Sequence, residues 1–207
     1  MVKPEAKSVV GEYKWGFHDD EKPLYKAEKG LSEGIVREIS KIKSEPEWML
    51  EKRLNALEIF NQAKNPEWPG GSNLLESIDF DNIRYYVRAT DKDSTDWEDV
   101  PEYIKDTFDK LGIPEAEKQF LAGAGAQYDS EVVYHNIRED LAKQGVLFLA
   151  MDQALEEYPE MVKEYFGTII PSGDNKYAAL NTSVWSGGSF IYVPPGVKID
   201  IIEVNAF

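Results

Sequence analysis

Two tight turns near the end of the chain constrain its fold more than any other feature of the sequence. They are Ser186-Gly187-Gly188 and Pro194-Pro195-Gly196, and the run Phe190–Val193 between them has the residues of a strand. Val197 to Ile201 then alternates apolar and polar side chains, which predicts another strand. Short strands joined by tight turns, with no helix between them, indicate the start of a sandwich, a barrel or a β-helix.

The pattern before residue 66 is helical. Ser32 can cap a helix that places three isoleucines on one face, Ile35, Ile39 and Ile42. Ser44 and Glu47 then have the spacing of a capping box. The helix after it carries leucines at i, i+4 and i+7, which are Leu50, Leu54 and Leu57, and it is expected to end near Asn65-Pro66. These two segments predict a helical hairpin.

Mixed structure is expected between the hairpin and the terminal turns. The predicted strands are Ile83–Val87 and Val146–Leu149, with Ser130–Val133 either a strand or the entry to a helix through Asn136–Lys143. Helices are expected to open at Pro101 and Pro114, to be capped by Asp152, and to run from Pro159 to Phe166. From Lys176 to Trp185 the residues are small and β-favouring, and they indicate the beginning of the β region.

Composition excludes several kinds of site. The formal charge of −15 repels phosphate backbones, so a nucleic-acid partner is not expected, whereas basic proteins are attracted. There is no cysteine, and the two histidines, His18 and His135, are far apart in sequence, so neither a thiolate site nor a histidine-rich metal site is expected. No apolar run is long enough for a membrane span and no leader pattern is present, which predicts a cytoplasmic protein.

Three motifs resemble functional sites, but the functional interpretation is not preferred for any of them. The acidic run Asp91, Asp93, Asp96 and Asp99 puts Glu102 at the twelfth position of a calcium loop, but Asp96 stands where that loop needs glycine, so helix-start aspartates are the preferred interpretation. Gly123-Ala124-Gly125-Ala126 resembles the start of a dinucleotide fingerprint but lacks the third glycine. Tyr134, His135 and Asn136 form a polar cluster for which a helix-start histidine is the preferred interpretation. We therefore assign no catalytic, cofactor-binding or metal residue, and Trp68 is either a docking residue or a loop anchor.

Several long strings resemble a known family. They are Tyr128 to Ile137, Glu157-Tyr158-Pro159, Tyr165-Phe166-Gly167, Asp174 to Asn181 and Val184 to Pro194. All of them are similar to the SufB subunit of the SUF iron–sulfur cluster assembly system, in the SufB/SufD family, and the likeness extends from about Gly30 to about Asp200. After Asp200 the chain departs from the family's usual strand sequence.

The resemblance implies an α+β fold in which a helical N-terminal region leads into the first strands of a right-handed parallel β-helix, here truncated. The expected divisions are a flexible N-terminal arm (1–30), a helical hairpin (31–66), a mixed α/β region (67–170) and the start of the β-helix (171–207). The family further implies a non-catalytic scaffold that works with the SufC ATPase, a SufD-like paralogue and sulfur-donor proteins. The nascent cluster and its cysteine ligands are expected in parts of the family that lie downstream of this region.

Two other interpretations stay open. A β-helix bearing many carboxylates and tryptophans can be a carbohydrate-active enzyme, but the acids of this chain fall mostly on predicted helix starts and helix faces. A shortened, nonfunctional gene product is the other, and it would expose a free strand edge at Val197 to Val204 that promotes aggregation.

Overall fold

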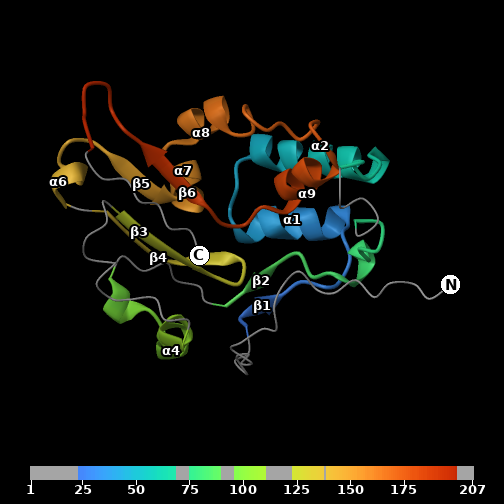
Figure 1. Cartoon of the computed structure of the whole chain (residues 1–207), viewed down its shortest axis with the longest axis horizontal. Coiled ribbons are helices and arrows are strands. Elements are labelled where there is room, and N and C mark those ends of the chain that lie inside the picture. Colours follow the sequence, from blue (N-terminus) through green and yellow to red (C-terminus); the bar gives the residue numbers. More distant parts are fainter. Residues whose placement is uncertain (1–22, 69–74, 90–95, 111–122, 138, 200–207) are drawn as a thin grey trace.

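The computed structural model describes residues 23–68, 75–89, 96–110, 123–137 and 139–199 as a mixture of helices and short strands (Figure 1). In chain order these elements are β1 (Tyr25–Lys26), α1 (Glu33–Ile42), α2 (Glu47–Gln62), the 3₁₀ turn η1 (Phe80–Asn82), β2 (Val87–Arg88), the 3₁₀ turn η2 (Trp97–Asp99), α4 (Glu102–Lys110), β3 (Gly123–Tyr128), β4 (Glu131–Ile137), α6 (Glu139–Ala142), β5 (Leu147–Ala150), α7 (Met151–Glu157), α8 (Pro159–Tyr165), α9 (Lys176–Val184) and β6 (Ser189–Tyr192). The expected α+β class is confirmed. The predicted arm at 1–30 lies mostly outside these ranges.

The predicted helical hairpin is present as α1 and α2, although its turn differs from the prediction. Ser32 caps α1 as expected, because its hydroxyl accepts the Ile35 backbone N–H at 3.3 Å. Ser44 was predicted to cap α2, and this is wrong: the N-cap is Pro46, and Ser44 lies in the turn with φ of +52°. Glu45, the residue between them, turns inward to meet α2.

The buried face of α2 is offset by one residue from the predicted leucine stripe. The fully or nearly fully buried positions are spaced as on one helix face, and they are Met49, Arg53, Ala56 and Phe60, with Leu57 beside them. Leu50 and Leu54 are only partly buried. An arginine therefore occupies the centre of an otherwise apolar stripe.

Strand pairing in the described ranges consists of three two-stranded antiparallel sheets, β1–β2, β3–β4 and β5–β6. In the last of these, Leu147 pairs with Tyr192 and Ala150 pairs with Ser189. The predicted strands at Val146–Leu149 and Phe190–Val193 are thus confirmed to within one residue. Their antiparallel pairing differs from the parallel coils that the β-helix prediction requires, and none of the described strands forms such a coil.

The segment from Lys176 to Val184 corrects the sequence prediction most clearly, because it forms the helix α9 and no strand. Asn175 caps this helix by accepting the N–H groups of Tyr177 and Ala178 at 2.8 and 3.1 Å. Ala178, Ala179 and Leu180 follow, and these residue types favour helices strongly enough to outweigh the β-favouring ones after them. Val197 to Ile199 forms no strand, and the remainder of that predicted strand lies outside the described residues.

The middle of the chain gives a mixed outcome. The helix opened by Pro101 is α4, and the one that Pro159 opens is α8, as predicted. Gly123-Ala124-Gly125-Ala126 lies in β3, paired with β4 in a hairpin, which agrees with the rejection of a dinucleotide fingerprint. The expected strand at Ile83–Val87 is reduced to β2 and an isolated bridge at Arg84. The helix predicted at Pro114 lies outside the described residues.

Two apolar clusters hold the helices together. The helices α2 and α9 lie side by side and antiparallel (Figure 1). One cluster joins α2, α7, α8 and the end of α9 through Met49, Ala154, Leu155, Val162 and Trp185. The other joins α1 to the β1–β2 side through Ala27, Ile35, Ile39 and Tyr86. The turn between α1 and α2 is connected to both clusters, because Lys43 lies over the Tyr86 ring and Glu45 binds Arg53, which lies over the Trp185 ring.

Candidate functional site

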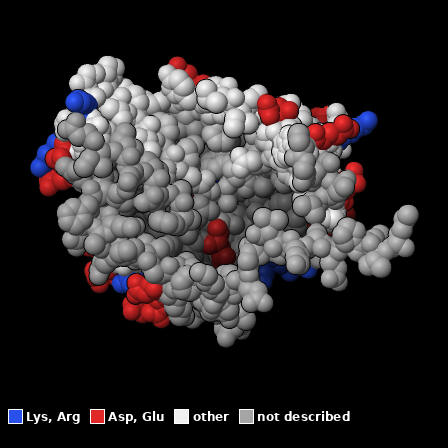
Figure 2. All heavy atoms as spheres, in the orientation of Figure 1, with Lys and Arg blue, Asp and Glu red and all other residues white. Residues whose placement is uncertain are grey.

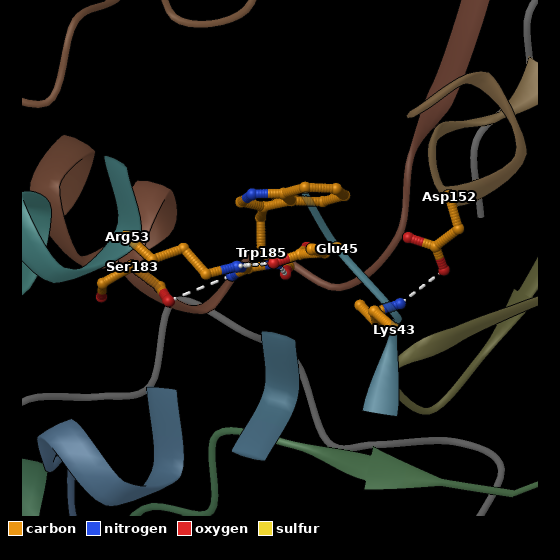
Figure 3. A network of polar contacts seen from close by, with 6 residues as sticks. All are labelled: Lys43, Glu45, Arg53, Asp152, Ser183 and Trp185. Carbon is orange, nitrogen blue, oxygen red and sulfur yellow. Dashed lines mark hydrogen bonds and ion pairs between the residues drawn. The ribbon is translucent and has the colours of Figure 1, made fainter. Parts of the chain in front are cut away.

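A fully buried ion pair lies at the turn between α1 and α2 (Figure 3). The Arg53 guanidinium donates from Nε to Glu45 Oε2 at 2.7 Å and from Nη2 to Glu45 Oε1 at 2.6 Å. This two-point geometry suits a planar guanidinium and a carboxylate. Both side chains are 0% exposed, so the pair must offset a desolvation cost of several kcal/mol for each ion.

The rest of the Arg53 guanidinium is satisfied by α9 and the residues after it. Nη1 donates to the Ser183 carbonyl at 3.0 Å, and Nη2 donates to the Trp185 carbonyl at 2.8 Å (Figure 3). The guanidinium carbon also lies 4.6 Å from the centre of the Trp185 ring, a cation–π contact. Arg53 therefore joins the α1–α2 turn to the end of α9, and we call Arg53, Glu45, Ser183 and Trp185 the arginine clasp.

A second ion pair leaves the same turn in another direction. Lys43 Nζ contacts Asp152 Oδ2 at 2.5 Å, and the lysine side chain is 2% exposed. The ammonium also lies 5.8 Å from the centre of the Tyr86 ring. Asp152 was predicted to cap α7, and this is wrong: the N-cap is Ala150, and the Asp152 carboxylate instead holds Lys43. The turn is thereby attached to α7 as well as to α9.

The chemistry of the clasp is structural, because its charged groups are already engaged with one another. Two buried polar atoms near it, Asp152 Oδ1 and Trp185 Nε1, find no hydrogen-bond partner among the described residues. The Trp185 indole N–H is a donor only, and the Arg53 guanidinium cannot act as a base. The arrangement can fix the relative positions of α1, α2, α7 and α9.

Two tyrosines beside the helical core have perturbed acidities. Burial, together with a hydrogen bond to the Glu38 carboxylate and the charges of Glu38 and Glu28, raises the pKa of Tyr25 to about 12. Burial and the nearby charges of Asp81 and Asp79 also raise the pKa of Tyr85. Both phenols are therefore neutral donors at physiological pH.

The cluster Tyr134, His135 and Asn136 lies in strand β4, so the interpretation of His135 as a helix-start histidine is wrong. Opposite these positions on β3 are Ala126, Gly125 and Ala124. Because successive strand residues belong to opposite faces, position 135 is separated from positions 134 and 136.

The acidic run near residue 96 is only partly described. Asp96 accepts the Glu98 N–H at 3.0 Å and so begins the 3₁₀ turn η2, which confirms its interpretation as a capping aspartate. Asp91 and Asp93 lie outside the described residues. Within the ranges that the structure covers, no group of three or more His, Asp or Glu residues could hold a metal ion, and no helix is long and apolar enough to cross a membrane.

Trp68 packs on its own domain, as the loop-anchor interpretation predicted, and its role as a docking residue stays a prediction. Its ring lies 5.8 Å from the ring of Tyr177 on α9, so it anchors the connection after α2 to its own domain. It nevertheless remains 47% exposed. Tyr177 lies in turn 6.3 Å from Phe80, which gives a small aromatic cluster at this end of the helical pair.

Arg53, the residue on which the clasp depends, was not among the residues predicted from the sequence. A signal was present: Arg53 lies four residues after Met49 and three before Ala56, on a helix face that continues to Phe60. A charged residue in an apolar stripe can be predicted to be buried only when the groups that bind it are known. The carbonyls it binds are distant in sequence, in a segment that was predicted to be strand.

Comparison with known proteins gives matches along most of the chain. Residues 126–202 match the family model described as SufBD protein N-terminal region. The chain is 58% identical, over 97% of its length, to an iron–sulfur cluster assembly SufBD family protein of Mycobacterium tuberculosis H37Rv and to one of Mycobacterium bovis. It is 55% identical, over 92% of its length, to a protein of the same description from Staphylococcus haemolyticus.

These relatives are much longer than the chain, which spans 24% of each mycobacterial protein and 40% of the staphylococcal one. The matched part of the family model is by its own description N-terminal. Over nearly its whole length the chain is therefore similar to part of these longer SufBD family proteins, and its residues 126–202 match the N-terminal family model.

Proposed function

We propose that the chain serves iron–sulfur cluster assembly as the N-terminal segment of a SufB-type scaffold subunit, and that it acts through contacts with other proteins. The observation that carries this proposal is the match of nearly the whole chain to proteins named for iron–sulfur cluster assembly. In the finer form of the proposal the subunit is SufB, works in the cytoplasm, and has the SufC ATPase, a SufD-like paralogue and sulfur-donor proteins as its partners.

The chemistry of the chain supports a contact role over a catalytic one. It has no cysteine, so by itself it can neither accept a persulfide nor hold a cluster through thiolates. The charged groups of the arginine clasp bind one another and two backbone carbonyls of the same chain. A rigid helical platform that leads into a longer β region, which we propose to be a β-helix, is consistent with a segment that positions partners.

The carbohydrate-active alternative has no supporting observation. Glycoside hydrolysis needs two carboxylates that flank one bond, and the alternative placed them on the β part of the chain. Strands β5 and β6, Leu147–Ala150 and Ser189–Tyr192, carry no carboxylate.

The proposal is tested by co-purification. The chain, carrying an affinity tag, is mixed with purified SufC, a SufD-type subunit, the cysteine desulfurase and its sulfur carrier, each separately and together. We expect retention of at least one of them at micromolar concentration, with Arg53→Ala reducing retention in proportion to the fraction of chain that it unfolds.

Retention of none of these proteins, with a chain that is folded by circular dichroism, would contradict the proposed function. Sedimentation of the purified chain addresses the nonfunctional alternative, because a folded monomer or defined oligomer is inconsistent with the aggregation that a free strand edge promotes.

A further inference from the structure

A short apolar segment, residues 165–170, begins at the last residue of α8 and leads toward α9; we call it the tip. Its side chains point into solvent: Tyr165 is 61% exposed, Ile169 is 91% exposed and Ile170 is 64% exposed. A single exposed apolar residue is common on protein surfaces and needs no explanation. Large apolar side chains gathered in one short segment are a feature of contact surfaces.

The backbone of the tip is fixed by hydrogen bonds and by packing from beneath. Gly167 has a φ of +72°, and both the N–H and the hydroxyl of Thr168 donate to the Tyr165 carbonyl, at 3.2 and 2.8 Å. Lys52 Nζ on α2 donates to the Phe166 carbonyl at 2.8 Å. The Phe166 ring packs on Trp185, 5.3 Å between ring centres, so the tip rests on the arginine clasp. An ordered tip loses little conformational entropy when it binds.

The helices that adjoin the tip carry many exposed carboxylates. The exposed carboxylates of the adjoining helices are Glu47, Glu51 and Glu58 on α2, Glu156 and Glu157 on α7, and Glu160 and Glu164 on α8. The cations on α2, α8 and α9 are Lys52, which is bound to Phe166, the buried Arg53 of the clasp, Lys163, whose ammonium lies 5.9 Å from the Trp48 ring, and Lys176, whose ammonium lies 4.8 Å from the Phe60 ring. Acidic side chains are visible beside α8 and at the end of α2 (Figure 2). Among the ion pairs of the described residues, none involves a carboxylate of this group.

We propose that the tip and its acidic border form the docking site for a partner protein that presents an apolar groove edged by lysine and arginine. The isoleucines would fill the groove, and the carboxylates would meet the basic edge. This inference rests on the proposed function and names the surface through which it operates. A second copy of the chain is a poor occupant because identical acidic borders repel, and an anionic membrane surface is repelled for the same reason.

The apolar part is tested with Ile169→Asp/Ile170→Asp. The matched control is Leu24→Asp, since Leu24 is 63% exposed and directly precedes β1, which pairs with β2. Binding of each variant to the SUF protein retained by the unmodified chain is measured by biolayer interferometry. We expect the double variant to bind about tenfold more weakly or worse and the control to bind normally. Circular dichroism checks that both remain folded.

The charge part is tested with Glu160→Lys and with Glu76→Lys as control. Both glutamates are exposed, but Glu160 lies on α8, the helix that leads into the tip, whereas Glu76 lies before η1. We expect Glu160→Lys to lower the association rate constant by a few-fold, with a smaller dependence on ionic strength. Glu76→Lys should leave both quantities close to those of the unmodified chain.

The outcomes separate this inference from the proposed function. If the unmodified chain binds none of the SUF proteins, both the proposed function and this inference are contradicted. If it binds one of them and the double isoleucine variant binds as tightly, the inference alone is overturned. Self-association of the chain that disappears in the double variant would identify a second copy as the occupant and would also overturn it.

Discussion

Arg53 is the residue whose removal should cost most. Replacing it by alanine leaves the Glu45 carboxylate buried without its cation and leaves the Ser183 and Trp185 carbonyls without donors. We expect Arg53→Ala to lower the free energy of unfolding by about 3–5 kcal/mol. Urea denaturation followed by circular dichroism measures the change.

The control for Arg53 is Arg37→Ala, which removes an exposed ion pair with Glu33 and should cost at most about 1 kcal/mol. Replacing both clasp charges, as Arg53→Met with Glu45→Met, should destabilise less than Arg53→Ala because no charge is left unpaired. Equal losses for Arg53→Ala and Arg37→Ala would show that the clasp is not the buried network described here.

Tyr25 predicts how stability responds to alkaline pH. Its folded-state pKa of about 12 is above the value of about 10 in an unfolded chain, so between these values the folded state holds the proton more tightly. This contribution is complete below pH 10 and is lost as the pH rises from 10 to 12. In Tyr25→Phe the decline over that window should be shallower, as measured by denaturation at pH 9, 10 and 11. A decline of unchanged slope would assign the effect to other groups.

At the scale of elements, the two serines at the ends of the hairpin helices should respond differently. Ser32 caps α1, so Ser32→Ala should cost about 1 kcal/mol of stability. Ser44 caps nothing and lies at φ of +52°, a conformation that glycine adopts more easily, so Ser44→Gly should be neutral or stabilising. Thermal melts of both variants make the comparison. A loss for Ser44→Gly as large as for Ser32→Ala would restore the capping box predicted from sequence.

The elements also show how far the sequence could be interpreted. Helices with local signals were predicted correctly: Ser32 before α1, Pro101 before α4 and Pro159 before α8 each mark a start. The face of α2 was misplaced because a leucine stripe suggests burial more strongly than a stripe containing Arg53 does. Asn175, as a helix-capping residue, could have indicated α9, but the β-favouring residues later in the segment led to the prediction of a β region.

The clasp itself could not have been predicted, for a reason that also applies to the pairing of β5 with β6. Arg53 and its carbonyl acceptors are 130 and 132 residues apart, and no local pattern connects them. The preference of Asp152 for a lysine of the hairpin over its own helix N-terminus is likewise a tertiary choice. The chain's likeness to SufBD family proteins was visible from its sequence strings, because that inference does not depend on knowing which segments touch.

For the whole molecule, the formal charge of −15 predicts a salt-dependent stability. Raising NaCl from about 0.01 M to about 0.15 M shortens the Debye length from about 30 Å to about 8 Å and screens the mutual repulsion of the carboxylates. We expect the Tm at pH 7 to rise over this range, as followed by differential scanning fluorimetry. Near the isoelectric point of about 4.6 the same addition should have much less effect. A Tm at pH 7 that is indifferent to salt would contradict this expectation.

The separation between Arg53 and its acceptors also has a consequence for synthesis on the ribosome. The hairpin emerges first, with a guanidinium whose carbonyl partners follow 130 and 132 residues later and an ammonium whose carboxylate follows 109 residues later. At elongation rates of about 5–20 residues per second, the wait for Ser183 is roughly 7–26 s. During that interval α2 cannot be enclosed without burying an incompletely bonded charge, so the nascent hairpin should stay open and accessible to chaperones until α9 has been translated.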